Sequence, residues 1–462
     1  MTYKSDILGQ DVRVASAEAL AAWNGTVMAF LAHGAKTPVH LAELLALEPG
    51  LALAHAVKGL FYMMLGRREL VPVAQEALTT AQAIARENPL DLREAAFVSA
   101  LDSWMRGSPR GSVAQMERIM ASHPQDSLAM KVGHAIRFMQ GDSVGMRSSL
   151  ERVLPAYEAG HPACGYLMGC HAFALEETRE YARAETSGRM GLALCPDDAW
   201  GLHAVAHVFD MTGNAAGGLA WLNGREAGWA HCNNFRYHVW WHKALMQLDL
   251  GQIDAALALY DTEVRKDRTD DYRDISNGTS LLSRLELAGV DVGDRWEELA
   301  DLCEKRTEDA CLVFADLHYM LALIGGHRDT AIAQMMQRMR RTAAEAKSEM
   351  AVITSNPGLA AAAGLEAFGE GDYRNAYLNL ASVRRNMPGI GGSHAQRDVF
   401  ERLTIDAAIR GGYLEDATAL LADRSALRNG SKDGYTQARL ALIDRATTKG
   451  HAASPALRSL AK

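Results

Sequence analysis

Turn signals recur along this chain every 34 to 45 residues, and this period constrains the fold more than any other feature. The turns are predicted at Gly66, Gly107, Gly141, Arg179, Gly213, Gly251, Gly289, Gly326, Gly371 and Gly412. Between them, apolar residues return with helical spacing. Two helices per unit at this period are typical of an α-solenoid. We therefore predict an all-α array of about ten helical hairpins over residues 1–445, followed by a polar C-terminal tail, residues 446–462.

The units also share a small residue at one position. An alanine lies five residues after the turn marker in five units: Ala184, Ala256, Ala331, Ala376 and Ala417. Tyr260 adds an aromatic residue four positions further, and Pro196 closes the unit that contains Ala184. This pattern resembles the tetratricopeptide repeat, in which small residues let two antiparallel helices approach closely. The resemblance implies a right-handed superhelix with a concave groove.

Three longer stretches carry a more specific resemblance. They are residues 198–208 (DAWGLHAVAHV), 240–245 (WWHKAL) and 391–400 (GGSHAQRDVF). With these motifs the chain resembles bacterial members of the tetratricopeptide repeat protein 38 family over nearly its whole length. The resemblance implies a stand-alone repeat protein. It brings no settled biochemical role, so it supports the fold and leaves the function open.

Composition limits the class of partner. Hydrophobic residues make up 48% and charged residues 23%, as expected for a globular protein. The formal net charge of −8 disfavours nucleic acid, because phosphate binding needs a basic surface. No apolar run reaches the roughly 18 residues of a membrane span. The six cysteines show no CxxC pair and no secretory signal is visible, so we expect a cytoplasmic protein without a membrane partner.

Chemistry-bearing residues concentrate in the central units, about residues 163–265, where two HxxxH pairs occur. In the repeat register, Trp200, His203, His207 and Asp210 form one stripe that lines the concave groove. The next unit directs His238 and Trp241 to the same groove and places His242 on the flank. The preceding unit contributes Tyr166 and Glu176. His171 falls at a packing position.

Three interpretations of this cluster compete. In the first, His203 and His207 bind a divalent transition metal, with zinc as the candidate ion, and His238 or His242 supplies a third ligand. Asp210 or Glu176 is then a base or outer-shell partner. The motif is not HExxH, because position 204 is alanine. In the second, His203, His207, His238 and Asp210 perform metal-free acid–base catalysis or bind a polar molecule between Trp200, Trp241 and His242. In the third, the histidines only form hydrogen bonds within the solenoid.

A glycine-rich loop precedes residue 394. Ser393 and Gln396 have the spacing of a capping box, so a helix is predicted to begin at His394. We favour a turn with a good helix cap over a functional loop. In the functional alternative Ser393, His394 and Arg397 lie at the groove rim and contact the same ligand as the histidines. Whether the loop reaches them depends on how far the superhelix curls.

Two functions therefore remain in view. The first is a ligand-binding repeat protein whose concave pocket holds a small molecule; if it is an enzyme, it is a metal- or His/carboxylate-dependent hydrolase or lyase. The alternative is a non-catalytic scaffold that binds a peptide or a partner helix in the groove. Homo-oligomerisation is left open.

Overall fold

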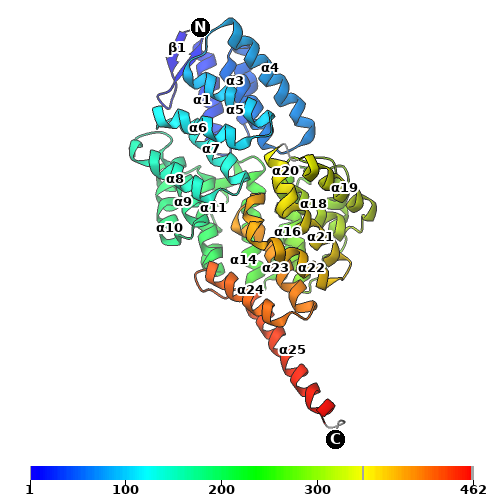
Figure 1. Ribbon diagram of the computed structural model, residues 1–462. Coiled ribbons are helices and arrows are strands. Elements are labelled where there is room, and N and C mark those ends of the chain that lie inside the picture. Colours follow the sequence, from blue (N-terminus) through cyan, green and yellow to red (C-terminus); the bar gives the residue numbers. More distant parts are fainter. Residues whose placement is uncertain (1, 346–347, 459–462) are drawn as a thin grey trace.

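The computed structural model describes residues 2–345 and 348–458, and it confirms the predicted all-α, tetratricopeptide-like solenoid (Figure 1). The helices of the first half are α1 (Ala17–Leu31), α2 (Thr37–Leu47), α3 (Ala52–Met64), α4 (Val71–Glu87), α5 (Leu92–Met105), α6 (Pro109–Ser122), α7 (Ser127–Met139), α8 (Ser143–Val153), α9 (Cys164–Glu177), α10 (Tyr181–Leu194), α11 (Ala199–Met211) and α12 (Ala215–Leu222).

The helices of the second half are α13 (Ala227–Ala230), α14 (Phe235–Asp249), α15 (Ile253–Leu259), α16 (Tyr272–Leu287), α17 (Arg295–Glu304), α18 (Val313–Gly325), α19 (Asp329–Glu345), α20 (Glu349–Ile353), α21 (Leu359–Gly369), α22 (Tyr373–Val383), α23 (His394–Arg410), α24 (Leu414–Leu427) and α25 (Gly434–Arg458). Short 3-10 or π segments extend several of them. Among the described residues, no helix is both long and apolar enough to cross a membrane.

The predicted turns are confirmed by backbone conformation. Nine of the ten markers have a positive φ, including the non-glycine Arg179 at 68°. The exception is Gly326, where the next residue, His327, takes the left-handed conformation with φ 55°. The five alanines of the repeat pattern are all buried. Small residues therefore lie where two helices of a hairpin meet, as the repeat pattern predicts.

The N-terminus begins with a β-hairpin that the sequence pattern did not predict. Strands β1 (Thr2–Ser5) and β2 (Asp11–Val14) pair antiparallel. The Asp6 carboxylate accepts hydrogen bonds from two backbone N–H groups of the turn and from the indole of Trp23 at 2.9 Å. Four-residue strands are too short to stand out as an alternating pattern, so the helical repeats dominated the prediction.

The second half of the chain folds back onto the turns of the first half. Arg67, after the first turn, pairs with Asp270 at 2.8 Å. The carbonyl of Gly107 accepts a hydrogen bond from the backbone of Glu349 at 3.1 Å. The hydroxyl of Tyr181 donates to the carbonyl of Leu427 at 2.7 Å. Figure 1 shows α20 and α23 in yellow and orange beside the cyan and green helices. The inner side of the array is thus enclosed by its own later units.

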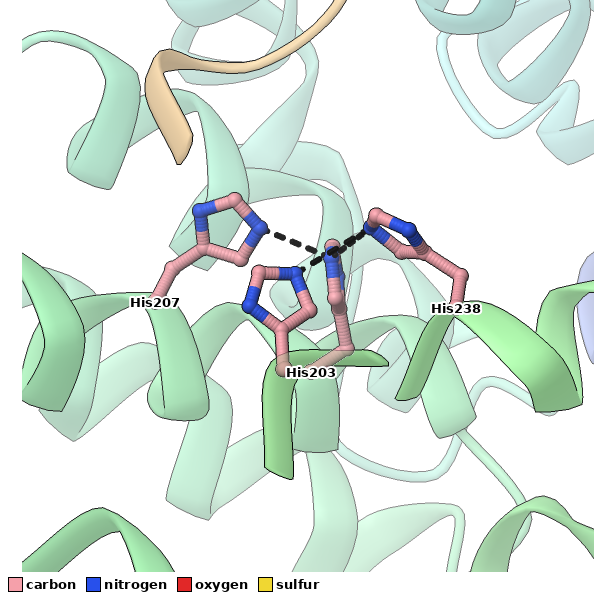
Figure 2. A group of neighbouring side chains, drawn as sticks. His203, His207 and His238 are labelled. Atoms are coloured by element: carbon pink, nitrogen blue, oxygen red, sulfur yellow. Dashed lines mark hydrogen bonds between the residues drawn. The ribbon is translucent and has the colours of Figure 1, made fainter. Parts of the chain in front are cut away.

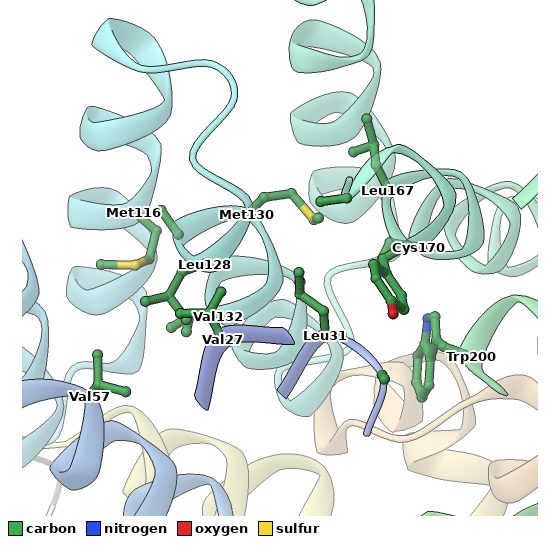
Figure 3. Close-up of a cluster of buried hydrophobic side chains, with 14 of the residues drawn as sticks. Val27, Leu31, Val57, Met116, Leu128, Met130, Val132, Leu167, Cys170 and Trp200 are labelled. Atoms are coloured by element: carbon green, nitrogen blue, oxygen red, sulfur yellow. The ribbon is translucent and has the colours of Figure 1, made fainter. Parts of the chain in front are cut away.

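Closure buries inner helices that would line an open groove in an extended solenoid. Helix α16 is buried almost throughout, although it carries Asp274, Asn277 and Arg284. The apolar core continues through the first half, where Leu31 of α1, Val132 of α7 and Trp200 of α11 belong to one buried cluster (Figure 3). At the other end, α25 crosses residue 446 without a break, so the expected start of the tail is not a change in secondary structure. Residues 459–462 of that tail lie outside the described residues.

Candidate metal centre

Two neighbouring helices bring four histidines to one point. His203 and His207 lie one turn apart on α11, and His238 and His242 lie one turn apart on α14. The Nε2 atom of His203 is 2.8 Å from that of His207 and 3.1 Å from that of His238. The Nε2 atoms of His242 and His238 are 3.1 Å apart. One ligand atom from each of the four lies within 4.8 Å of the others. Figure 2 shows the labelled rings pointing toward one another.

The local sequence explains this placement. Asp198 caps α11 by accepting a hydrogen bond from the backbone N–H of Gly201 at 3.1 Å. The cap fixes the residue at which the helix begins. Within the helix, His203 and His207 share one face because they are four residues apart. The register predicted both of them, and His238, on the groove side. The flank position predicted for His242 differs from the structure, in which its ring turns fully into the cluster.

The cluster is sealed from solvent. Exposure is 1% for His203, 0% for His207, 9% for His238 and 1% for His242. Burial lowers the pKa of His203 and His242 well below the usual range, and the neighbouring imidazoles add to this effect. Burial lowers the pKa of His238 to about 3. His207 differs: burial lowers its pKa, but the nearby carboxylates of Glu176, Glu177 and Asp210 together raise it above the usual value. Three of the four rings are therefore neutral, the state that binds metal.

Two further residues contact the outer nitrogens of the cluster. The Nδ1 atom of His238 lies 2.8 Å from Oδ1 of Asn277, on α16. The Nδ1 atom of His207 lies 3.5 Å from a carboxylate oxygen of Glu176, which is fully buried and has no hydrogen-bond partner among the described residues. Glu176 was predicted near the cluster. Asn277 was not, because nothing in the repeat register relates α16 to His238.

These outer contacts decide where the ring protons lie. The oxygen of Asn277 can only accept, so His238 carries its proton on Nδ1 and presents a lone pair at Nε2. Glu176 likewise favours a proton on Nδ1 of His207. The Nε2 atoms of His207 and His238 both face that of His203, and the Nε2 atom of His242 faces that of His238. The four inner nitrogens are thus close enough to hydrogen-bond with one another or to bind one cation.

Aromatic side chains enclose the centre on both sides. The ring centroid of Trp200 lies 5.1 Å from that of His203, and Trp241 stacks on His238 at 5.1 Å. Both indoles were predicted as pocket walls. Sequence reasoning missed Phe173, 5.7 Å from His203, and His33, which stacks on Trp200 at 5.1 Å. Since His33 comes from the turn after α1, far away in the chain, no local signal relates it to this centre.

Two predicted residues point elsewhere. The carboxylate of Asp210 accepts a hydrogen bond from Arg428 at 2.9 Å and does not join the four histidines. Tyr166 directs its hydroxyl to Asp197 at 2.8 Å, away from the imidazoles. The Asp210 contact follows from chain closure, since Arg428 lies 218 residues later. Its charge still contributes to the raised pKa of His207, after the larger effects of Glu176 and Glu177.

The glycine-rich loop does reach the edge of the centre. Ser393 forms the predicted capping box with Gln396, and α23 begins at His394. The backbone N–H of His394 donates to the carboxylate of Glu177 at 2.7 Å, and its ring lies 2.8 Å from the Glu177 carbonyl. Arg397 donates to the same carboxylate at 3.2 Å. Glu177 follows Glu176 directly. The loop therefore holds the segment that carries Glu176 and does not touch the histidines of the centre.

No family model matches the sequence, so the resemblance to the tetratricopeptide repeat protein 38 family stays a prediction. Among solved structures, the chain is similar to the human IFIT1 dimer with PPP-AAAA, with a TM-score of 0.40 and 13% identity over 94% of this chain and 96% of that one. The IFIT1 dimer with m7Gppp-AAAA gives a TM-score of 0.40 and 14% identity over 95% and 96%. Naa15/Naa10 bound to HypK-THB gives 0.25 and 12% over 88% and 62%.

Proposed function

We propose that this helical-repeat protein binds one divalent transition-metal ion through His203, His207, His238 and His242, with a small polar molecule as the ligand of the loaded centre. The observation that carries the proposal is the convergence of four Nε2 atoms, with contacts of 2.8 and 3.1 Å. Four nitrogens around a tetrahedral zinc ion, each about 2.0–2.1 Å from it, lie about 3.3 Å apart. Three of the six nitrogen–nitrogen distances are thus within about half an ångström of this value, and the others do not exceed 4.8 Å.

The donor set favours zinc. Imidazole suits zinc, copper, iron and nickel, whereas calcium and magnesium prefer oxygen ligands. The outer contacts of Asn277 and Glu176 supply what a metal-bound histidine needs, a fixed proton on the far nitrogen. His203 and His242 have no such contact among the described residues, since the Nδ1 atom of each is without a partner. We therefore infer that one of these two is the ligand that exchanges most readily.

This difference suggests how such a centre acts on a substrate. A catalytic zinc needs an open or exchangeable position, and His203 or His242 could leave one free. The metal would supply Lewis-acid chemistry at a substrate oxygen, and Glu176, through His207, would balance the added charge. Hydrolysis or elimination on a small polar substrate fits this arrangement. Asp210 is left out of this proposal because Arg428 holds its carboxylate.

The scaffold alternative needs a long open groove over many units. The structure offers less of one, since α16 and α18 are buried over almost their whole length. The enclosed centre therefore favours the ligand-binding function over peptide capture. The cytoplasmic location and the absence of a nucleic-acid partner remain predictions from the sequence.

The test is the metal content of the purified protein, measured by elemental analysis before and after dialysis against zinc. We expect about one equivalent in the wild type and almost none in the double variant His203→Ala/His238→Ala. His171→Ala is the matched control, because His171 is also buried on an inner helix but contacts Ser187 at 3.3 Å instead of the centre. A wild-type protein that binds no transition metal under either condition, while its circular dichroism shows folded helices, would rule the proposal out.

A further inference from the structure

A cavity of about 330 Å³ lies next to the histidine centre, on the same faces of the same helices. Asp210 follows His207 by three residues on α11, and Leu245 follows His242 by three on α14; both line the cavity. A residue three positions further lies on the same helix face. The stripe that carries the histidines therefore continues into the cavity wall. The volume is in the range of small-molecule sites.

The wall of this cavity carries many charges, and most of them are paired at close range. Close pairs join Arg402 to Asp398 (2.7 Å), Arg424 to Asp433 (2.7 Å), Arg428 to Asp210 (2.9 Å) and Arg439 to Asp406 (2.9 Å). Each of these arginines has its charge balanced within hydrogen-bond distance. The paired charges make a rigid, polar wall.

Among the arginines of this wall, Arg284 is the exception. It is 2% exposed, and its nearest carboxylate oxygen, on Asp398, is 3.8 Å away. One terminal nitrogen donates to the carbonyl of Ala395 at 2.6 Å and the other to that of Ser280 at 3.1 Å. Its Nε atom has no partner among the described residues. A buried guanidinium bound mainly to neutral oxygens keeps an unbalanced positive charge, which is costly without a counter-ion.

The same arginine connects the cavity to the centre. Its guanidinium carbon lies 5.5 Å from the ring centroid of Trp241. The ring of Trp241 in turn lies 4.8 Å from that of His242, one of the two ligands of which we expect one to exchange. A molecule held in the cavity by Arg284 is thus one side chain away from the proposed metal ligands.

We propose that this cavity binds a small organic anion through its carboxylate or phosphate group, with Arg284 as the residue that holds it. This assigns the substrate class of the centre, and in that respect it rests on the proposed metal binding. The charges agree: a divalent ion held by four neutral imidazoles needs a negative partner beyond Glu176. Arginine suits both anions because its planar fork matches their oxygens.

The experiment measures binding of two probes, acetate and inorganic phosphate, by titration calorimetry on zinc-loaded and chelator-treated protein. We expect saturable binding of at least one probe, at least tenfold weaker in Arg284→Lys, and tighter with zinc than without it. The probe that binds better tells a carboxylate from a phosphate ligand. Arg338→Lys is the matched control, because Arg338 is equally buried (3%) but holds Asp316 at 2.6 and 2.8 Å outside the cavity.

A second variant covers the case in which Arg284→Lys does not fold. Asp249 lines the cavity, and among the described residues its carboxylate accepts a hydrogen bond only from the backbone of Gly434, at 2.8 Å, so Asp249→Asn removes a negative charge at little structural cost. We expect it to bind the anion several-fold more tightly. The inference is overturned if neither probe binds the wild type, or if both variants bind like the wild type. Zinc binding without anion binding would reject the cavity alone. Anion binding by a protein that takes up no transition metal when dialysed against it would reject the metal centre alone.

Discussion

Asn277 on α16 accepts a hydrogen bond from Nδ1 of His238 on α14, at 2.8 Å, and so directs the other nitrogen of that ring to the three remaining histidines. The two residues are 39 positions apart and belong to neighbouring units. Asn277 is 1% exposed, so water does not replace this contact. The pair fixes the orientation of a buried neutral histidine, as the proposed metal centre requires.

Removal of this acceptor should weaken metal binding without abolishing it. We expect Asn277→Ala to lower zinc affinity about 10- to 100-fold, as for other outer-shell partners. Asn277→Asp keeps an acceptor and should stay close to the wild type. Competition with a chromophoric chelator measures the affinity. Asn379→Ala, at an amide that bonds only to its own helix, is the control. Equal losses in the Ala and Asp variants would contradict the role given to Asn277.

Metal removal should destabilise the folded protein. A ligand that binds only the folded state at a thousand times its dissociation constant adds about 4 kcal/mol of stability. We therefore expect a chelator to lower the midpoint of thermal unfolding by several degrees, and added zinc to restore it. In His203→Ala/His238→Ala the chelator should have no effect. A chelator effect of the same size in that variant would place the responsible metal elsewhere.

The glycines at the repeat turns should differ in their tolerance of alanine. Gly141 and Gly251 both have a positive φ, 66° and 72°, so a side chain costs about 1–2 kcal/mol at either. A Cβ at Gly141 would also overlap the carbonyl oxygen of Pro388, whereas nothing lies within 4 Å at Gly251. We expect Gly141→Ala to lower the thermal midpoint clearly more than Gly251→Ala does. Similar losses would mean that the two halves pack less closely than described.

The buried carboxyl of Asp198 should give stability a pH dependence. Burial raises its pKa to about 7, from an ordinary value of 3.8, despite the opposing charge of Lys131. The folded state therefore binds the proton more tightly, and this contribution to stability is lost as the pH rises toward 7 and above, by up to about 4 kcal/mol.

Asp198→Asn cannot ionise and still caps α11. We expect its thermal midpoint, relative to that of the wild type, to rise between pH 5.5 and pH 8. Asp372→Asn is the control, since Asp372 also caps a helix but the backbone and side chain of Asn375 lower its pKa, so it does not titrate in this window. A difference between Asp198→Asn and the wild type that stays constant with pH would show that Asp198 has no raised pKa.

The sequence predicted which side chains lie close together where this depended on one helix or on neighbouring units. His203 and His207 share a face because they are four residues apart, and the repeat register placed His238 opposite them. Glu176, Trp200 and Trp241 follow from the same count. The direction of the His242 side chain depends on how α14 is rotated about its own axis. The repeat register does not fix this rotation closely enough to tell the groove side from the flank.

The sequence by itself determined the helical hairpins, their turns and the pairing of histidines on two adjacent helices, because these depend on local periodicity and backbone preference. Only the tertiary structure decided that the array curls closed. That closure buries the four histidines, pairs Asp210 with Arg428 and brings the loop at His394 into contact with Glu177. Curvature is the sum of small rotations between successive units, and no single stretch of sequence encodes it.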